Sequence, residues 1–186
     1  PFLMAQTSYS ELFGPKSAYV SIAVAHNGRI DEGMKAVLVE NERVKKFGFT
    51  ETELERQKTA LLNGMEKAFN ERNNQKSINY AQEYKRNFLI TEEPFPGIEN
   101  EYEYFKTFLP TITAAEINEL AKTWISNDNR VFVVAAPEIE GSKIPTEAEV
   151  LAVAEAVEKM EIEPYKDAVT NVPLVEYEPV GSKVKS

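Results

Sequence analysis

The sequence predicts an α+β domain in which helices pack on one face of a mainly antiparallel sheet. Two segments with strand-like alternation come first, at residues 1–10 and 18–27. A long run of amphipathic helical segments follows, from Ile30 to Ile125. Because the strands precede the helices and do not alternate with them one by one, this order favours an α+β layer structure over a doubly wound parallel sheet.

The composition limits the class of protein and its partners. The chain has 186 residues, 42% of them hydrophobic and 27% charged, which is enough apolar material for one domain with a real core. A net charge of −9 argues against binding to nucleic acid or to anionic lipid. No run approaches the roughly 18 apolar residues of a membrane span, so we expect no membrane insertion. The absence of cysteine excludes disulfides, thiolate nucleophiles and Cys–zinc sites.

The second strand segment carries two different faces. One face is apolar and is expected to lie under the helix layer: it consists of Val20, Ile22 and Val24. The other is small and mixed, which suits a face that meets another domain or a cavity. Together with the first strand it gives one candidate surface for a ligand chamber, formed by Gln6, Ser8, Tyr19 and Ser21. The alternative is a partly exposed sheet face without a ligand, which antiparallel sheets tolerate.

Local signals mark where the helices begin and end. An apolar stripe at helical spacing consists of Met34, Val37, Leu38, Asn41 and Val44. Gly48 supplies the left-handed residue that ends this helix. Three capping boxes, in which a threonine hydroxyl and a glutamate satisfy free backbone N–H groups, then predict three helix starts: Thr50 with Glu53, Thr113 with Glu116, and Thr146 with Glu149.

The remaining elements complete the expected domain. The polar residues 70–77 interrupt the helices, and Pro94 and Pro96 impose a second break. The segment from Arg130 to Ala136 is expected to be a buried strand that ends before Pro137. We expect one domain over residues 1–160 and a proline-punctuated linker over residues 161–186. These ends favour a piece of a larger protein, and the alternative is a small protein with trimmed ends.

No catalytic residue and no metal ligand is predicted in this chain. A zinc site needs about three or four converging ligands, and the single histidine, His26, is followed by Asn-Gly-Arg-Ile, which fits no zinc-peptidase motif. A Ser-His-Asp site would have to recruit His26, and no nucleophile-elbow motif is present. The chain has neither a glycine-rich phosphate loop nor marked catalytic carboxylates. The aromatic-acidic run "EYEYFKTF" is a second candidate binding surface. The favoured alternative is that Tyr102 and Phe105 are core residues.

Three ordered motifs resemble the insulinase/pitrilysin family of zinc peptidases: "RVKKFGFTETELERQK", "PTITAAEINELA" and "NRVFVVAAPE". The resemblance covers roughly residues 1–160 and points to the second domain of the N-terminal half of a large bacterial zinc protease. It implies a partial domain of the insulinase/mitochondrial-processing-peptidase-like metallohydrolase fold. In that family the zinc is held in the first domain by H-x-x-E-H and a distant glutamate, and none of these residues has a counterpart here.

The resemblance implies a supporting role. We expect a non-catalytic domain that braces the zinc domain and forms part of the wall of a peptide chamber. Its expected partners are the zinc-binding domain and the C-terminal half of the same parent chain, together with a peptide substrate. Zinc is expected in the parent chain and not in this segment. The resemblance suggests the periplasm or cell envelope. The alternatives are a structural or peptide-binding subunit of an inactive family member and, without positive support, an unrelated enzyme using surface carboxylates.

Overall fold

The computed structural model describes residues 2–13, 16–91, 93–137, 143–168 and 181. A hairpin of two strands comes first, β1 (Phe2–Phe13) and β2 (Lys16–Ala25). Six helices follow: α1 (Ile30–Phe47), α2 (Glu51–Asn70), α3 (Ser77–Arg86), α4 (Ile98–Phe108), α5 (Ala114–Trp124) and α6 (Glu147–Glu158). Short helical turns lie at Arg72–Asn74, Asn87–Thr91 and Leu109–Thr111. The prediction of an α+β domain is confirmed.

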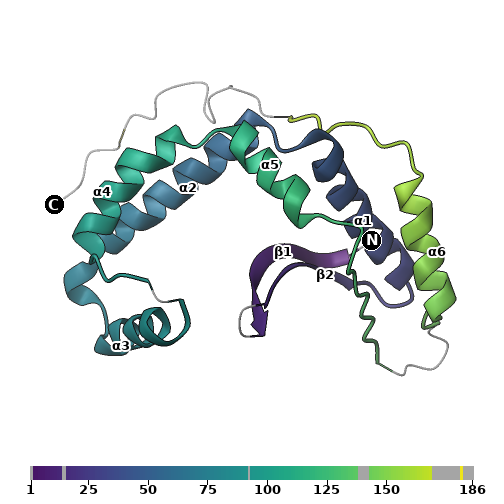
Figure 1. Cartoon of the computed structure of the whole chain (residues 1–186), viewed down its shortest axis with the longest axis horizontal. Helices are drawn as coiled ribbons and strands as arrows, with labels where there is room; N and C mark the ends of the chain where they lie inside the picture. Colours follow the sequence, from purple (N-terminus) through teal and green to yellow (C-terminus); the bar gives the residue numbers. More distant parts are fainter. Residues whose placement is uncertain (1, 14–15, 92, 138–142, 169–180, 182–186) are drawn as a thin grey trace.

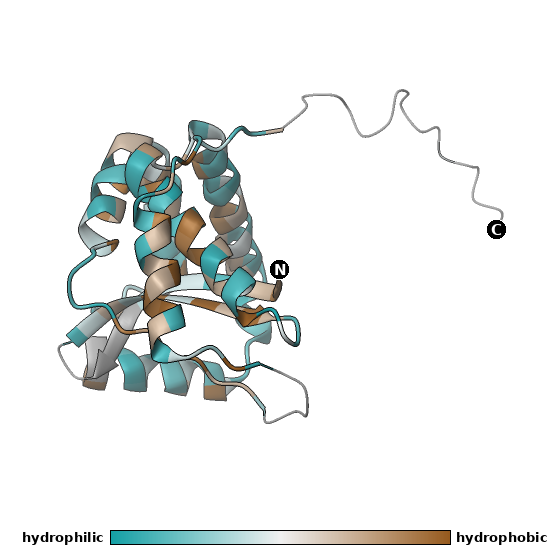
Figure 2. Cartoon of the chain, turned by 90° about the vertical axis from the view of Figure 1, so that its right-hand side faces the viewer, coloured by the Kyte–Doolittle hydropathy of each residue, from teal (hydrophilic) through white to brown (hydrophobic). Residues whose placement is uncertain are grey.

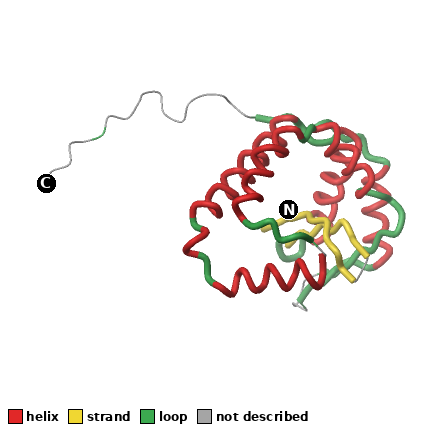
Figure 3. Tube along the Cα trace, turned by 60° about the vertical axis from the view of Figure 1, so that its left-hand side comes forward, coloured by secondary structure: helices red, strands yellow, loops and turns green. Residues whose placement is uncertain are grey.

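The helices form an arch, and the hairpin lies beneath it (Figure 1). The two strands pair antiparallel, with Thr7 opposite Ser21 and Tyr9 opposite Tyr19. Helix α1 packs on β2, and α5 and α6 pack on α1. A view from another side shows the hairpin surrounded by helices (Figure 3). Hydrophilic and hydrophobic stretches are interleaved along the helices, as amphipathic packing requires (Figure 2).

The predicted helix signals are confirmed. Thr50, Thr113 and Thr146 each cap a helix, and in each case the threonine and the glutamate three residues later make the reciprocal hydrogen bonds of a capping box. Gly48 ends α1 at φ +73° and ψ −173°, a backbone conformation that essentially only glycine adopts. The sequence did not predict the π-helical turn Asn87–Thr91 after α3.

The core is small and lies where α5 and α6 meet α1. Its apolar members are Ala114, Ala121, Ile125, Val150, Ala154, Val157 and Ile162. A second packing unit joins α2 to α4, where the rings of Phe69 and Tyr102 stack with their centroids 5.0 Å apart. Tyr102 and Phe105 are half-buried, so the structure favours the core interpretation of "EYEYFKTF" for these two rings.

The expected orientation of β2 is wrong. Tyr19 and Ser21 face α1, whereas Ile22 and Val24 on the opposite face are each 44% exposed. The reason lies in α1, whose apolar stripe contains Asn41. A partly buried amide needs hydrogen-bond partners, and Tyr19 and Ser21 supply them. The small side chains on this face of β2 also allow the helix to approach closely.

The expected buried strand at Arg130–Ala136 is also not formed. The segment is extended in Figure 1, but it belongs to no sheet, and residues 130–137 make no backbone hydrogen bond to another described residue. Val131 and Val133 are each 83% exposed. A strand needs a neighbouring backbone edge for its N–H and C=O groups, and the described part of the chain places none beside this segment.

The described residues after 160 pack back on the helices. Ile162 is buried, Arg43 Nε donates to the Glu163 carbonyl at 3.0 Å, and Arg56 pairs with Asp167 at 2.7 Å. The boundary at residue 160 stays a prediction, and most of the expected linker lies outside the described residues. Within the described ranges, no helix is long and apolar enough to cross a lipid bilayer.

Candidate functional site

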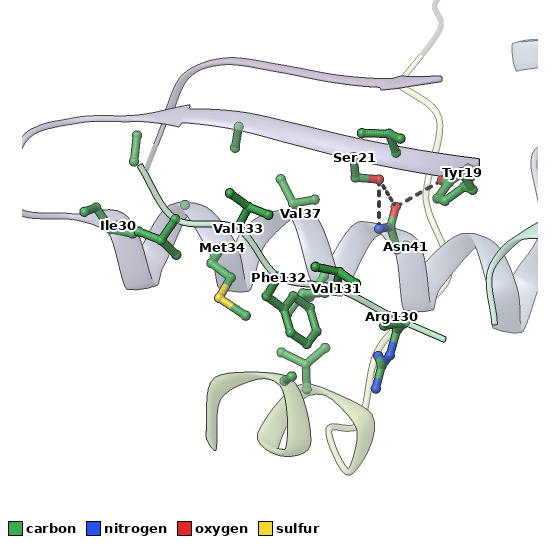
Figure 4. Close-up of a pocket in the computed structure, with 18 of the residues that line it drawn as sticks. Tyr19, Ser21, Ile30, Met34, Val37, Asn41, Arg130, Val131, Phe132 and Val133 are labelled. Carbon is green, nitrogen blue, oxygen red and sulfur yellow. Dashed lines mark hydrogen bonds between the residues drawn. The ribbon is translucent and has the colours of Figure 1, made fainter. Parts of the chain in front are cut away.

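A large cavity lies between β2, α1 and the extended residues 130–137 (Figure 4). Its volume is about 1100 Å³, slightly above the ~300–1,000 Å³ of most small-molecule pockets. One wall is α1, which contributes Ile30, Met34, Val37 and Asn41. The lining is mainly apolar, and Tyr19, Ser21 and Asn41 form a polar cluster at one end. This cavity contains half of the residues that the sequence predicts for a chamber face.

The polar end of the cavity is a hydrogen-bond network centred on Asn41. Tyr19 Oη donates to Asn41 Oδ1 at 3.1 Å, and Asn41 Nδ2 donates to Ser21 Oγ at 3.0 Å (Figure 4). Thr7 Oγ1 lies 3.2 Å from Ser21 Oγ on the neighbouring strand. Each side chain in this network therefore has a partner within the domain. Such a satisfied network stabilises the contact between the hairpin and α1.

The register of the hairpin divides the four predicted chamber residues between two faces. Gln6 is opposite Ile22 and Ser8 is opposite Val20, so both lie on the open face of the hairpin. Tyr19 and Ser21 lie on the other face, against α1. The expected single surface of Gln6, Ser8, Tyr19 and Ser21 is therefore not formed. The reason is that cross-strand pairing, and not alternation within each strand, decides which residues share a face.

The open face of the hairpin is mainly apolar around its two polar residues. Met4 is 50% exposed and Ile22 is 44% exposed, and Gln6 and Ser8 are also exposed. In an isolated domain the apolar area of this face stays in contact with water, so it does not contribute the free energy that burial would provide. It is the part of the predicted site that remains accessible.

Arg130 lines the cavity at the start of the extended segment. Its guanidinium pairs with Glu158 on α6, and its Nε donates to the Asn127 carbonyl at 3.1 Å. The guanidinium carbon also lies 5.6 Å from the centroid of the Phe132 ring. These contacts hold the start of the extended segment against α6, and they leave the valines that follow exposed.

The described residues do not offer a ligand set for a zinc ion. In the ranges that the structure describes, no group of three or more His, Cys, Asp or Glu side chains converges as metal ligands. His26 lines the cavity at the end of β2, without acidic or histidine neighbours in such a group. A zinc ion bound by protein needs about three or four ligands.

The ionisable groups with perturbed pKa values lie elsewhere. Hydrogen bonds from Lys143 and Thr146 lower the pKa of Glu149 to about 2, and bonds from Thr113 lower the pKa of Glu116. Both are helix caps. Burial, together with the nearby Glu83, raises the pKa of Glu101. Glu101 lines a second cavity of about 1120 Å³ between α3 and α4, together with Asn87, whose buried Oδ1 has no hydrogen-bond partner among the described residues.

Comparison with known proteins finds a sequence similarity to a zinc protease. No protein-family model matches it. "Zinc protease PQQL-like" from Arabidopsis thaliana is 34% identical over 80 residues, which are 43% of this chain and 8% of that protein. Over these 80 residues the chain is similar to a zinc protease.

The fold agrees with that relationship. The solved first half of the periplasmic protease PqqL from Escherichia coli matches 89% of this chain and 36% of its own, with a TM-score of 0.68 and 14% identity. The solved PqqL matches 94% of this chain and 19% of its own, with a TM-score of 0.73 and 17% identity. At such identities the structures show the fold alone. The chain thus spans about a third or less of the relatives it matches.

Sequence reasoning missed two parts of this cavity. Asn41 occupies one position of an otherwise apolar stripe, and a single amide in such a stripe is a signal for polar partners on the facing strand. No local sequence signal shows that residues 130–137 lack a paired strand, because pairing depends on whether another strand lies beside them.

Proposed function

We propose that this chain is the non-catalytic supporting domain of a zinc metalloendopeptidase. The observation that carries the proposal is the 34% identity to a zinc protease over 80 residues. The chain spans only a small part of that protein, and its described residues offer no zinc ligand set. Peptide hydrolysis would therefore depend on a zinc domain elsewhere in the parent polypeptide. The periplasm or cell envelope is the proposed compartment, because the matched protein of known structure is periplasmic.

The exposed apolar surface supports a domain that works in contact with others. The turn after α3 exposes Phe88 by 74% and Leu89 by 63%. Large contiguous apolar patches on a protein surface usually mark contacts with other protein segments. The zinc-binding domain and the C-terminal half of the parent chain are the partners we propose for these surfaces.

The open hairpin face is the proposed contribution to the chamber wall. Gln6 and Ser8 project from this face, whereas Tyr19 and Ser21 are held beneath it by Asn41. An extended peptide over the hairpin would therefore meet the first pair and not the second. This narrows the candidate substrate contacts to two polar side chains in an apolar surround.

Kinetics of the parent enzyme test this assignment. Replacing Gln6 and Ser8 together by alanine should raise KM about 3- to 10-fold for several peptides, which corresponds to the loss of one or two hydrogen bonds. The value of kcat should stay nearly unchanged, because these contacts would bind substrate and transition state equally. Thr7→Ala is the matched control, since Thr7 lies between the two and faces α1. Unchanged constants in the double variant would exclude a role in the chamber.

The supporting role itself makes a separate prediction. The parent should retain zinc after dialysis and hydrolyse unstructured peptides, whereas residues 1–186 alone should do neither. Zinc retained stoichiometrically by residues 1–186 would contradict the proposal, because it would require a ligand set in this chain.

A further inference from the structure

The extended residues 130–137 have the composition of an inner strand but no strand partner. Val131, Phe132, Val133 and Val134 are β-branched or aromatic, the types enriched in sheets. Their backbone makes no hydrogen bond to another described residue, and Val131 and Val133 are each 83% exposed. A bare edge of this kind pairs readily with other chains, and proteins normally cover it.

A second bare edge faces the same cavity. The sheet has the order β1–β2, so one edge of β2 has no partner strand among the described residues. In an antiparallel pair about half of the backbone groups of each strand point away from its partner. Four consecutive residues of β2, Ala18 to Ser21, all line the cavity. Because consecutive residues point to opposite faces of a strand, the cavity must run along the edge of β2 and not over one face.

Helix α1 provides an apolar wall between the two edges. Met34 and Val37 both line the cavity, and the side chain of Val37 points toward β2 (Figure 4). A ligand that satisfies this site needs hydrogen-bonding groups along both of its sides and apolar side chains toward α1. An extended peptide backbone has both features. The volume of about 1100 Å³ also suits a peptide segment better than a small metabolite.

The segment that fills the cavity must have free backbone hydrogen-bonding groups along both of its edges. A second copy of this chain could not supply β2 for this purpose, since one edge of that strand is already bonded to β1. A substrate peptide would leave both edges bare whenever it departed, which favours aggregation. The solved relatives contain much more chain than the part matched here, which is 36% and 19% of their lengths. A strand from the same polypeptide meets these requirements.

We propose that the cavity is a slot for one further β-strand, supplied by a segment of the parent polypeptide outside residues 1–186. The segment pairs with β2 on one side and with residues 130–137 on the other, and so joins the hairpin and the extended segment in one sheet. Its side chains toward α1 are apolar. The inference depends on the proposed function only in taking the chain as part of a longer polypeptide, and it does not depend on peptidase activity.

Hydrogen exchange of the intact parent tests the slot directly. Without any added peptide, amides within residues 131–136 should exchange at least about 100-fold more slowly than in an unstructured peptide, as expected for strands that open only rarely. The protection should be the same at two protein concentrations tenfold apart. A photo-crosslinking residue at position 133 should form cross-links within one polypeptide, to residues outside 1–186.

Three results would overturn the proposal. Fast exchange of residues 131–136 in the folded parent would show that the edge stays open. Protection that appears only after addition of peptide would assign the slot to a ligand, and protection that increases with concentration would assign it to a second copy. None of these readouts is peptidase activity, so an inactive parent with a protected, internally cross-linked segment would contradict the proposed function and still support the slot.

A pair of variants of the parent adds a control. Val133→Asp should reduce the protection of residues 131–136 at least about tenfold by placing a charge inside the sheet. Leu151→Asp replaces an apolar side chain of α6 that is 46% exposed and does not line the cavity, and it should leave that protection unchanged. Equal effects of the two variants would contradict the proposal. If Val133→Asp fails to fold, the hydrogen exchange of residues 131–136 in the unsubstituted parent still tests whether the slot is filled.

Discussion

Gly48 joins α1 to α2 at a point where both the backbone and a neighbouring side chain exclude a larger residue. Its φ of +73° and ψ of −173° are almost restricted to glycine. A Cβ atom at this position would lie 2.4 Å from Cγ and 2.4 Å from Nδ2 of Asn118 on α5. We therefore predict that Gly48→Ala destabilises the domain through two separate effects.

The magnitude follows from those two effects. The backbone conformation should cost about 2 kcal/mol for a residue with a Cβ. Asn118 must also move, and it is held by two hydrogen bonds to Phe49: the Phe49 N–H donates to Oδ1 at 2.7 Å, and Nδ2 donates to the Phe49 carbonyl at 3.2 Å. Both bonds are exposed, so water replaces them partly and their joint loss should cost about 1 kcal/mol. The expected total is about 3 kcal/mol.

A double-mutant cycle measured by urea unfolding tests this reasoning. Trp124 is the single tryptophan of the chain and reports unfolding by its fluorescence. Asn118→Ala alone should cost about 1 kcal/mol, and almost nothing in the Gly48→Ala background, because Asn118 has already lost its bonds there. Gly64→Ala is the matched control: it lies within α2, has no atom near its Cβ position, and should stabilise by about 0.5–1 kcal/mol. Equal costs of Asn118→Ala in both backgrounds would refute the account.

Three further outcomes are expected. Tyr19→Phe should reduce the free energy of unfolding by about 1 kcal/mol through loss of its bond to Asn41, and an unchanged value in urea unfolding would contradict that bond. Because the pKa of Glu149 is lowered to about 2, its contribution to the free energy of unfolding is complete above the ordinary value near 4.5 and disappears as the pH falls toward 2. Glu149→Gln should therefore lower Tm at pH 7 and have little effect near pH 2. An equal change of Tm at both pH values would refute this. Tyr9→Leu should alter the emission of Trp124, whose ring stacks on Tyr9 at 4.4 Å, and should cost about 1 kcal/mol beyond the lost area; an unaltered spectrum would contradict the stacking.

The features that the sequence predicted correctly are those determined within a few residues. A capping box needs only a threonine and a glutamate three positions apart, and Thr50, Thr113 and Thr146 all begin helices. Gly48 adopts the expected positive φ for the same reason.

The features that failed depend on neighbours distant in the sequence. The sequence shows that Val20 and Tyr19 lie on different faces of β2, but not which face meets α1. Asn41 decides this by requiring hydrogen-bond partners, and it lies 22 residues from Tyr19. The segment after Arg130 has the residues of a strand, and whether it becomes one depends on a second backbone edge. Candidate chamber residues chosen by alternation alone were therefore divided between the two faces of the hairpin.

The most direct test of the central claim is hydrolysis of an unstructured peptide mixture by the parent polypeptide, measured before and after treatment with a zinc chelator. The account predicts cleavage that the chelator abolishes and added zinc restores, with no cleavage by residues 1–186 under any of these conditions. A folded parent that neither binds zinc nor cleaves peptide would contradict the account and would assign this domain to a structural or peptide-binding protein.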